Sequence, residues 1–388
     1  MTDAGVVHTL AFFPWFQLRE PVDAGPFELV PYHRGRTPGG QGSDVQKACD
    51  AILETYRTAP RAVVSRAMLL RIAGGGVTDL VEDDHIHRLL IWGELVAFAG
   101  LSTRRFFDET SYVNRDALRL VVQQFADPTR GVGMQFRRRD GSSNVHVTRG
   151  AAVFPRPLHA VTGLRGEIDV PLLQALTTRA EQDGWGRYQE AIQSFNAANT
   201  DDPSVLEESE IVTLVGALER LFDLSRGKED ELAAEVIRAL DSGSTMSPLA
   251  SLRVGRSPTP VRYTGRDSMR EVWIRDVFQL RGQHAHGKIE PRMTTLWSRR
   301  EHLLFASFAF PLILKHELAR EGFYTLTLGD KGRLAAFEEL LDPDHFLVRD
   351  PFHDGPYPWS EVLSRTSMRA WINERLAAHH EQNDSSTD

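Results

Sequence analysis

The sequence contains very little cysteine: Cys49 is the only one among 388 residues. An intrachain disulfide is therefore excluded, and such a composition is typical of a reducing compartment. The N-terminal segment "MTDAGVVHTLAFFPWF" carries an acid where a signal peptide has basic residues, and it has no small-residue cleavage site. We expect a cytoplasmic protein without a signal peptide.

Long hydrophobic runs and excess positive charge are also missing. The longest apolar run, residues 303–314, has twelve residues and contains a proline, so it is too short to span a bilayer. We expect no membrane partner. The formal net charge is −8, which excludes general electrostatic attraction to nucleic acid. Any contact with nucleic acid must come from a local basic patch.

Signatures of several enzyme classes are absent. The sequence has neither a phosphate-binding glycine-rich motif with its lysine nor a G-x-S-x-G motif. His85 and His87 in "DDHIH" suggest zinc, but side chains two positions apart on a helix point in different directions. No third histidine or cysteine follows at ligand spacing. The sequence therefore predicts no metal and no cofactor.

The elements that the sequence does indicate make an α+β protein. Residues 1–165 predict a mixed α+β domain, in which a sensor or regulatory role would fit. The expected strands are 8–18 and 26–32, the expected helices are 44–57 and 83–107, and 132–150 is an expected β-hairpin with Asp140-Gly141 in its turn.

Residues 166–325 predict a domain built from helices alone. Its clearest helix has Asp202 as N-cap and Pro203 at the first helical position, followed by one apolar stripe from Ile211 to Phe222. The other expected helices are 171–183, 185–197, 229–240, 268–283 and 298–320. A long segment rich in Gly, Ser, Pro and Arg, 241–267, predicts a functional or mobile loop.

The C-terminal part predicts an extension of the helical domain. We expect residues 326–380 to form this extension, with a helix at 360–379. The polar end of the chain, 381–388, predicts a disordered tail.

The stretch "LRGQHAHGK", residues 280–288, concentrates chemistry in a short space. Arg281 lies in the last turn of a predicted helix that ends near Gly282, and His286 follows at Arg-x4-His spacing. One explanation is a helix end, where a cation is favoured by the helix dipole. The other is a phosphate-handling site. Arg375 and His380 have the same spacing without a following glycine, and we interpret that second pair as chance.

The stretch resembles the signature of HEPN domains, Arg-x4–6-His, often ending in His-Gly. The order of elements is similar to the Apea-like HEPN group: a helix like "EIVTLVGALERLF" (210–222), a variable loop, and then the Arg…His-Gly helix. The resemblance covers roughly 170–320. It implies a helical bundle, often dimeric, and active members are metal-independent ribonucleases.

Carried over to this sequence, the resemblance makes Arg281 and His286 a catalytic pair, with Gly287 closing the motif. One position departs from the pattern, because Gly282 stands where the family commonly has Asn, Asp or His. We hypothesise that His284 supplies the missing polar group. Histidine is suited to proton transfer near neutral pH, and arginine can stabilise charge on a phosphorane.

Other residues could support such a site. Glu219 could reach across the bundle and orient Arg281, although a solvated or intrahelical glutamate is the plainer interpretation. Residues 266–300 hold eight Lys/Arg against four Asp/Glu, a local excess of +4. This excess indicates an RNA-facing surface or an ordinary solvated face. The candidate RNA-binding residues are Lys288, Arg292, Arg299 and Arg300.

The sequence thus favours an endoribonuclease that acts by attack of the RNA 2′-hydroxyl, with RNA, including tRNA, as substrate. A single Arg-His pair is a small site, so a homodimer that joins two pairs is expected. Such proteins resemble effectors of phage defence or toxin–antitoxin systems, with an antitoxin or sensor as partner. An inactive HEPN module that binds RNA or protein is the alternative, favoured by Gly282. A generic helical bundle is the third.

Overall fold

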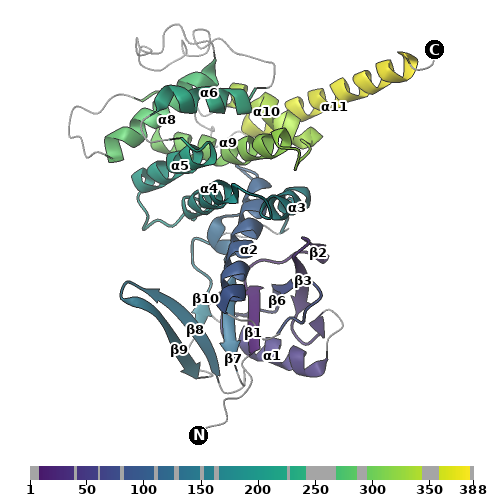
Figure 1. The fold of residues 1–388 in the computed structure, drawn as a ribbon, viewed down its shortest axis with the longest axis vertical. Coiled ribbons are helices and arrows are strands. Elements are labelled where there is room, and N and C mark those ends of the chain that lie inside the picture. The colour runs from purple at the N-terminus through teal and green to yellow at the C-terminus, as the bar shows by residue number, and fades with distance from the viewer. Residues whose placement is uncertain are drawn as a thin grey trace, which may run out of the picture. The chain divides into compact units, whose positions relative to one another are not determined.

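The computed structural model describes residues 8–38, 42–59, 62–78, 83–108, 112–125, 131–148, 153–160, 166–224, 228–241, 268–285, 295–342 and 358–384. The chain divides into two compact units. The first unit comprises Met1–Trp185 and Asn199–Pro203, and the second comprises Gly186–Ala198 and Ser204–Asp388. The first unit combines sheets with helices and the second is helical in its described residues, so the chain is of the α+β class (Figure 1).

The first unit is built on an antiparallel sheet with the strand order β2-β3-β6-β1-β7-β8-β9. These strands are β1 (His8–Phe13), β2 (Val22–Asp23), β3 (Phe27–His33), β6 (Arg66–Ile72), β7 (Val121–Phe125), β8 (Gly131–Arg138) and β9 (Gly141–Thr148). β4 (Tyr56–Ala59), β5 (Ala62–Val63) and β10 (Phe154–Pro155) form a second small sheet, in which β10 runs parallel to β4.

Both faces of the larger sheet are covered because its central strands are apolar on both sides. Leu10 and Phe12 of β1 pack with α1 (Ser43–Leu53) in one core cluster. On the opposite face lies α2 (Asp83–Ser102), whose Trp92 stacks on Phe27 with ring centroids 5.1 Å apart. Figure 1 shows α1 and α2 beside this sheet.

Cys49 lies on the face of α1 that packs into the core. Its side chain is fully buried. Burial and the neighbouring Asp50 carboxylate raise the pKa of the Cys49 thiol to about 12. The thiol therefore stays protonated and packs as a small apolar side chain.

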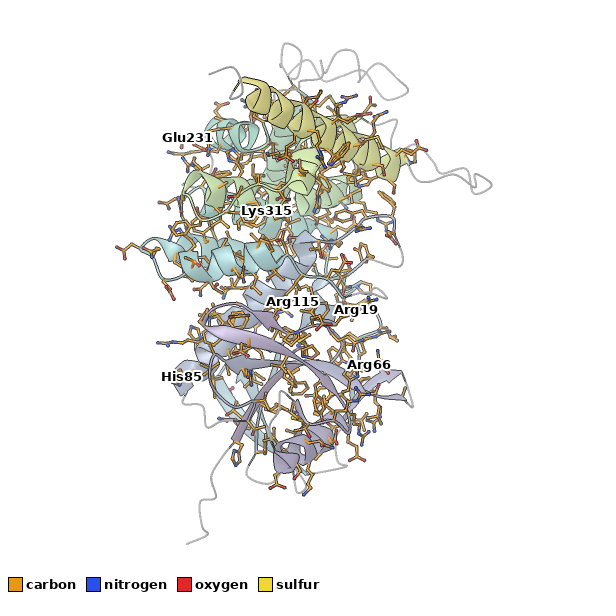
Figure 2. All side chains as sticks on the ribbon, turned by 90° about the vertical axis from the view of Figure 1, so that its right-hand side faces the viewer. Arg19, Arg66, His85, Arg115, Glu231 and Lys315 are labelled. Atoms are coloured by element: carbon orange, nitrogen blue, oxygen red, sulfur yellow. The ribbon has the colours of Figure 1, made fainter. Side chains whose placement is uncertain are left out.

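Two shorter elements complete the first unit. The 3₁₀ helix η2 (Arg115–Leu118) follows α2, and Arg115 (labelled in Figure 2) forms an ion pair with Glu94 of α2. The helix α3 (Val170–Arg179) is capped by Asp169. Thr177 of α3 donates a hydrogen bond of 2.8 Å to the carbonyl of Ala24.

The second unit packs helices around aromatic side chains. Its helices are α4 (Trp185–Ala197, from its second residue), α5 (Glu207–Leu221), α6 (Glu229–Ala239), α8 (Met269–Ala285), α9 (Arg299–Arg320), α10 (Leu328–Leu340) and α11 (Pro358–Asp384). Phe305 of α9 contacts Trp273 of α8 and Phe337 of α10, with ring centroids 6.4 and 6.5 Å apart. Trp359 of α11 stacks on the same ring, so one phenylalanine joins four helices.

Buried charges fix α9 in this core. Lys315 (labelled in Figure 2) donates to Asp330 of α10 at 2.6 Å, and both side chains are almost fully buried. Tyr324 and Thr327 also donate to Asp330, which satisfies the remaining oxygen. Burial alone would raise the pKa of Asp330, but the Lys315 charge and these hydrogen bonds lower it.

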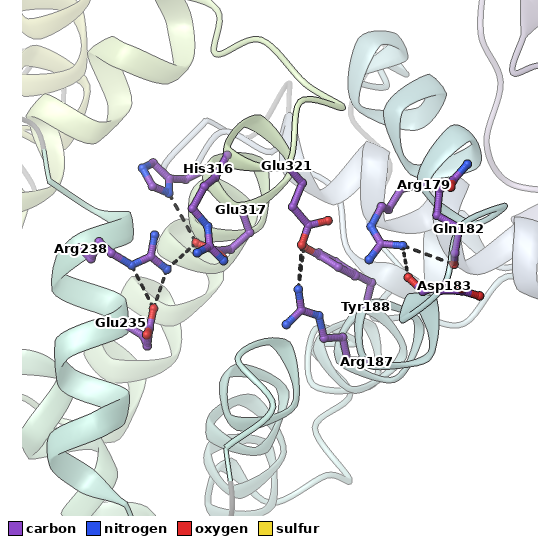
Figure 3. A network of polar contacts seen from close by, with 11 residues as sticks. Arg179, Gln182, Asp183, Arg187, Tyr188, Glu235, Arg238, His316, Glu317 and Glu321 are labelled. Carbon is purple, nitrogen blue, oxygen red and sulfur yellow. Dashed lines mark hydrogen bonds and ion pairs between the residues drawn. The ribbon is translucent and has the colours of Figure 1, made fainter.

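A second charged residue of α9, Glu317, pairs with Arg238 of α6 at 2.8 Å (Figure 3). Burial raises the pKa of Glu317, but its contact with His316 at 3.5 Å, its hydrogen bond from Arg238, and the charges of Arg238 and Arg320 outweigh this effect. The pKa falls to about 2. Glu321, one turn further on, accepts hydrogen bonds from Arg187 and Tyr188 of α4.

Several predicted bounds differ from the observed ones. The helix expected at 44–57 ends at Leu53, because Tyr56–Ala59 pair with strands instead. The helix expected from Asp202-Pro203 begins at Glu207. The expected β-hairpin is present as β8 and β9, whereas β6, β7 and α10 have no counterpart in the sequence analysis.

The domain limits also differ from those expected. The limit predicted at 165 falls before α3, but α3 packs into the first unit through Thr177 and Gln174. Residues 326–380 are part of the second unit, because α10 pairs with α9 through Asp330. Helix α11 continues to Asp384, into the predicted tail. The loop expected at 241–267 lies outside the described residues except for Asp241.

We predict that Glu317 makes the stability of the second unit depend on pH. Its folded pKa lies below the ordinary value of 4.5, so its contribution is present above about pH 4.5 and is lost as the pH falls toward about 2. Urea unfolding should therefore give a difference in free energy of unfolding between the parent chain and Glu317→Gln that is constant near neutral pH. This difference should shrink as the pH falls from about 4.5 to about 2.

The matched control for this prediction is Glu231→Gln on α6, whose ion pair with Lys228 is exposed. Its stability should follow the parent chain within about 1 kcal/mol at every pH. A gap for Glu317→Gln that stays constant down to pH 2 would contradict the prediction.

Candidate functional site

The candidate site lies at the C-terminal end of α8, and α8 is positioned by charged residues. Arg270 at its start is 3% exposed and pairs with Glu338 of α10 and Asp241. Arg275 is 8% exposed and donates to Asp230 of α6 at 2.7 Å. Neighbouring helices therefore cover faces of α8 that carry arginines, although arginines in a sequence normally indicate a face exposed to solvent.

Arg281 is the third arginine of α8 with a carboxylate partner. Its Nη2 donates to Oε2 of Glu219 on α5 at 2.8 Å, and the side chains are only 11% and 9% exposed. The guanidinium also lies 5.5 Å from the centre of the Phe278 ring. Of the two interpretations of Glu219, the structure thus shows the one in which it reaches across the bundle to the arginine.

The Arg281–Glu219 contact leaves hydrogen-bonding capacity. Within the described ranges, neither Nε of Arg281 nor Oε1 of Glu219 has a hydrogen-bond partner. Both atoms are buried, and such groups normally find partners. The pair thus uses one hydrogen bond where a bidentate arginine–carboxylate contact would use two.

Helix α8 does not end near Gly282 as expected. It runs three residues further, to Ala285, so Arg281 precedes the final turn and His284 is the basic residue of that turn. Of the two explanations for Arg281, the one in which it is the cation of the last helical turn therefore does not hold. Since residues three apart are neighbours on a helix surface, His284 and Arg281 lie on adjacent positions of one face. His284 is partly buried.

Four residues of the predicted site lie outside the described residues: His286, Gly287, Lys288 and Arg292. Their predicted roles stay predictions. Of the predicted catalytic and supporting residues, the structure therefore describes Arg281, Glu219 and His284.

The remaining candidate RNA-binding residues, Arg299 and Arg300, begin α9. Arg299 pairs with Glu208 at 2.6 Å and Arg300 with Glu207 at 2.9 Å, both in the first turn of α5. Arg299 is about one-third exposed and Arg300 is 88% exposed. These contacts connect α9 to α5 and neutralise part of the predicted basic patch.

Asp276 and His302, which were not among the predicted site residues, form a fully buried pair. Nε2 of His302 on α9 lies 3.2 Å from Oδ2 of Asp276, and the same oxygen accepts from the backbone N–H of Leu296. The pair joins α8 to the start of α9. No local motif signals it, because the two residues are 26 positions apart in the chain.

The described residues supply a cation, Arg281, whose side chain is largely buried, and an imidazole, His284, about one helical turn away. This arrangement suits an anionic group such as a phosphate. In the part of the chain that the structure describes, the clustered residues able to hold a metal ion belong to the first unit and not to this site.

Comparison of the chain with protein-family models, with curated proteins and with solved structures gave no match. No described helix is both long and apolar enough to cross a bilayer.

We predict that Gly282→Ala stabilises the protein. Gly282 lies inside α8, and an added Cβ would meet no atom within 4 Å. Replacing an interior helical glycine by alanine should raise the free energy of unfolding by about 0.5–1 kcal/mol. Urea denaturation measures the change, and Gly332→Ala is the contrasting variant because its Cβ would lie 2.9 Å from Ser367. Destabilisation by Gly282→Ala would show that the helix does not continue through this position.

We also predict strong energetic coupling between Glu219 and Arg281. Glu219→Gln or Arg281→Met leaves one buried charge uncompensated, so each should cost about 3–5 kcal/mol. The double variant should cost clearly less than the sum of the two, as a double-mutant cycle in urea would reveal. Arg300→Met with Glu207→Gln is the exposed comparison, where coupling of at most about 1 kcal/mol is expected. Additive costs at Glu219 and Arg281 would refute the pairing.

Proposed function

We propose that the chain is a metal-independent endoribonuclease of the HEPN type. The observation that carries the proposal is the contact between α5 and α8 through Glu219 and Arg281. It brings the helix that contains "EIVTLVGALERLF" against the helix that contains the first residue of the Arg-x4-His motif. A buried arginine so held is oriented in advance of substrate binding, which is what stabilisation of a developing charge requires.

The proposed reaction needs no metal ion. The 2′-hydroxyl of a ribose attacks the adjacent phosphorus, and the bond from phosphorus to the 5′-oxygen breaks. His286 moves the protons, from the attacking hydroxyl and to the leaving oxygen, and Arg281 stabilises the negative charge on the phosphorane. The products are a 2′,3′-cyclic phosphate and a 5′-hydroxyl end. His284, beside Arg281 on α8, takes the positioning role that Gly282 cannot fill.

We further propose that the active form is a homodimer in which two Arg-His pairs meet. An effector of phage defence or of a toxin–antitoxin system would work in this way, cleaving RNA such as tRNA in the cytoplasm. An antitoxin or sensor partner would then restrain it, and the first unit is the natural place for such regulation.

The second candidate function is an inactive HEPN module that binds RNA or protein. Two observations favour it. Gly282 lacks the side chain that commonly follows the arginine, and Arg299 and Arg300 are paired with Glu208 and Glu207. If these pairs persist in the presence of RNA, less positive charge is left for RNA, and a protein would be the ligand of the module.

The deciding experiment is cleavage of total RNA and tRNA by the purified chain in excess EDTA. His286→Ala should lower the cleavage rate about 10²–10⁴-fold, the usual contribution of a general acid–base group. Arg281→Lys is preferred over Arg281→Ala because lysine can still pair with buried Glu219. It should lower the rate about 10²–10³-fold, since it loses the planar fork that fits a phosphorane.

Arg375→Lys with His380→Ala is the matched control, because this second Arg-x4-His pair should leave cleavage unchanged. Circular dichroism establishes that each variant is folded. Cleavage that survives in both His286→Ala and Arg281→Lys would refute the assigned site. RNA binding without cleavage by the parent chain would establish the inactive module instead.

A further inference from the structure

Three side chains distant in sequence converge in the first unit: Asp116, His159 and Asp202. Nε2 of His159 lies 2.6 Å from Oδ2 of Asp116 and 3.9 Å from Oδ2 of Asp202. One donor atom from each residue lies within 4.8 Å of the other two. The side chains of Asp116, His159 and Asp202 are 18%, 20% and 31% exposed, so an ion from solvent can reach the cluster.

A buried asparagine holds two of these residues in place. Asn114, fully buried, caps the helix η2 that carries Asp116 by accepting from the backbone N–H of Ala117. Its Nδ2 donates to the carbonyl of His159 itself at 2.6 Å. One side chain therefore fixes the backbone on both sides of the Asp116–His159 contact.

The third residue sits in a separately anchored loop, 199–203. Nη2 of the buried Arg104 donates to Oδ1 of Asn199 at 2.6 Å, and the backbone N–H of Arg115 donates to the carbonyl of Asn199. Tyr112 donates to Asp201, whose φ of 55° is unusual for a residue other than glycine. Asp202 is thereby turned toward His159 rather than serving as the N-cap that its sequence context predicts.

An Asp–His ion pair alone would explain only part of this arrangement. A proton on Nε2 of His159 can be shared with Asp116, but Asp202 is too far from that nitrogen for a hydrogen bond. The protein nevertheless holds a second carboxylate near the first. Two carboxylates about one imidazole nitrogen repel each other, and a divalent ion bound among the three groups offsets that repulsion more strongly than the single charge of a protonated imidazole.

We propose that Asp116, His159 and Asp202 bind a divalent first-row transition-metal ion, with Zn²⁺ as the representative. One imidazole nitrogen and two carboxylate oxygens are a suitable donor set, whereas Mg²⁺ and Ca²⁺ prefer oxygen ligands alone. The ion replaces the proton between His159 and Asp116 and draws Asp202 inward. Three protein ligands leave a coordination position for water or a ligand group.

This site is independent of the proposed ribonuclease activity, because its three ligands all belong to the first unit and the HEPN-like residues belong to the second. RNA cleavage should therefore proceed in excess EDTA whether or not the metal site exists. Failure of one proposal leaves the other standing.

The test is titration of the full chain with Zn²⁺ after removal of bound metal with a chelator and of the chelator by gel filtration. Isothermal calorimetry should show one Zn²⁺ per chain. Asp202→Asn, Asp116→Asn and His159→Gln should each weaken binding at least about tenfold, since even residues that merely support metal ligands have effects of that size. Co²⁺ provides a second readout, through visible absorption of the bound ion that these variants lose.

The matched control is His85→Ala with His87→Ala, which removes the histidine pair that the sequence makes the obvious metal candidate. It should bind Zn²⁺ as the parent chain does. The proposal is overturned if the folded parent chain binds no Zn²⁺ stoichiometrically, if Asp202→Asn and His159→Gln bind normally, or if only the control loses binding. Asp202→Asn preserves side-chain size, and a thermal melt establishes that it is folded.

Discussion

The requirement that a buried arginine must find a carboxylate determines how the second unit is assembled. Helix α8 carries three arginines that pair with carboxylates of other helices. The partner of Arg270 lies on α10, that of Arg275 on α6 and that of Arg281 on α5. An unpaired charge in such a place costs several kcal/mol, so α8 cannot rotate or slide without breaking at least one pair. The aromatic core around Phe305 fills the space that these pairs define.

The same requirement shapes the candidate site. Glu219 already holds the guanidinium of Arg281 in one orientation. The side chain therefore loses little conformational entropy when an anion binds. The carboxylate, however, competes with that anion for the same donors. The balance between these effects depends on the donors of Arg281 that Glu219 leaves unused, and Nε is one of them.

The sequence could predict those parts of the fold that local patterns encode. Apolar periodicity located most helices, and Asp140-Gly141 located the β8–β9 hairpin. Where an element depends on contacts with residues distant in the sequence, these local patterns gave the wrong prediction. Tyr56–Ala59 form a strand because distant β10 lies beside it, and Asp202 carries a helix-capping signal but is turned toward His159 by the anchored loop.

The candidate site was predictable to a similar degree. The motif identified Arg281, and Glu219 could be proposed as its partner from the edge of an apolar stripe. Only the packing of α5 on α8 decides that the two meet. Asp276 with His302, and Asp116 with His159, were beyond reach because their pairing depends on tertiary structure and leaves no spacing pattern in the chain.

The burial of Cys49 has a practical consequence for studying the protein. A thiol reacts as its thiolate, and this one is both inaccessible and held protonated. In the folded protein, Cys49 is therefore not expected to react with maleimide or methanethiosulfonate reagents. A cysteine introduced on the surface of either unit would be the sole attachment point for a spin label or fluorophore, and two such cysteines would report the distance between the units in solution.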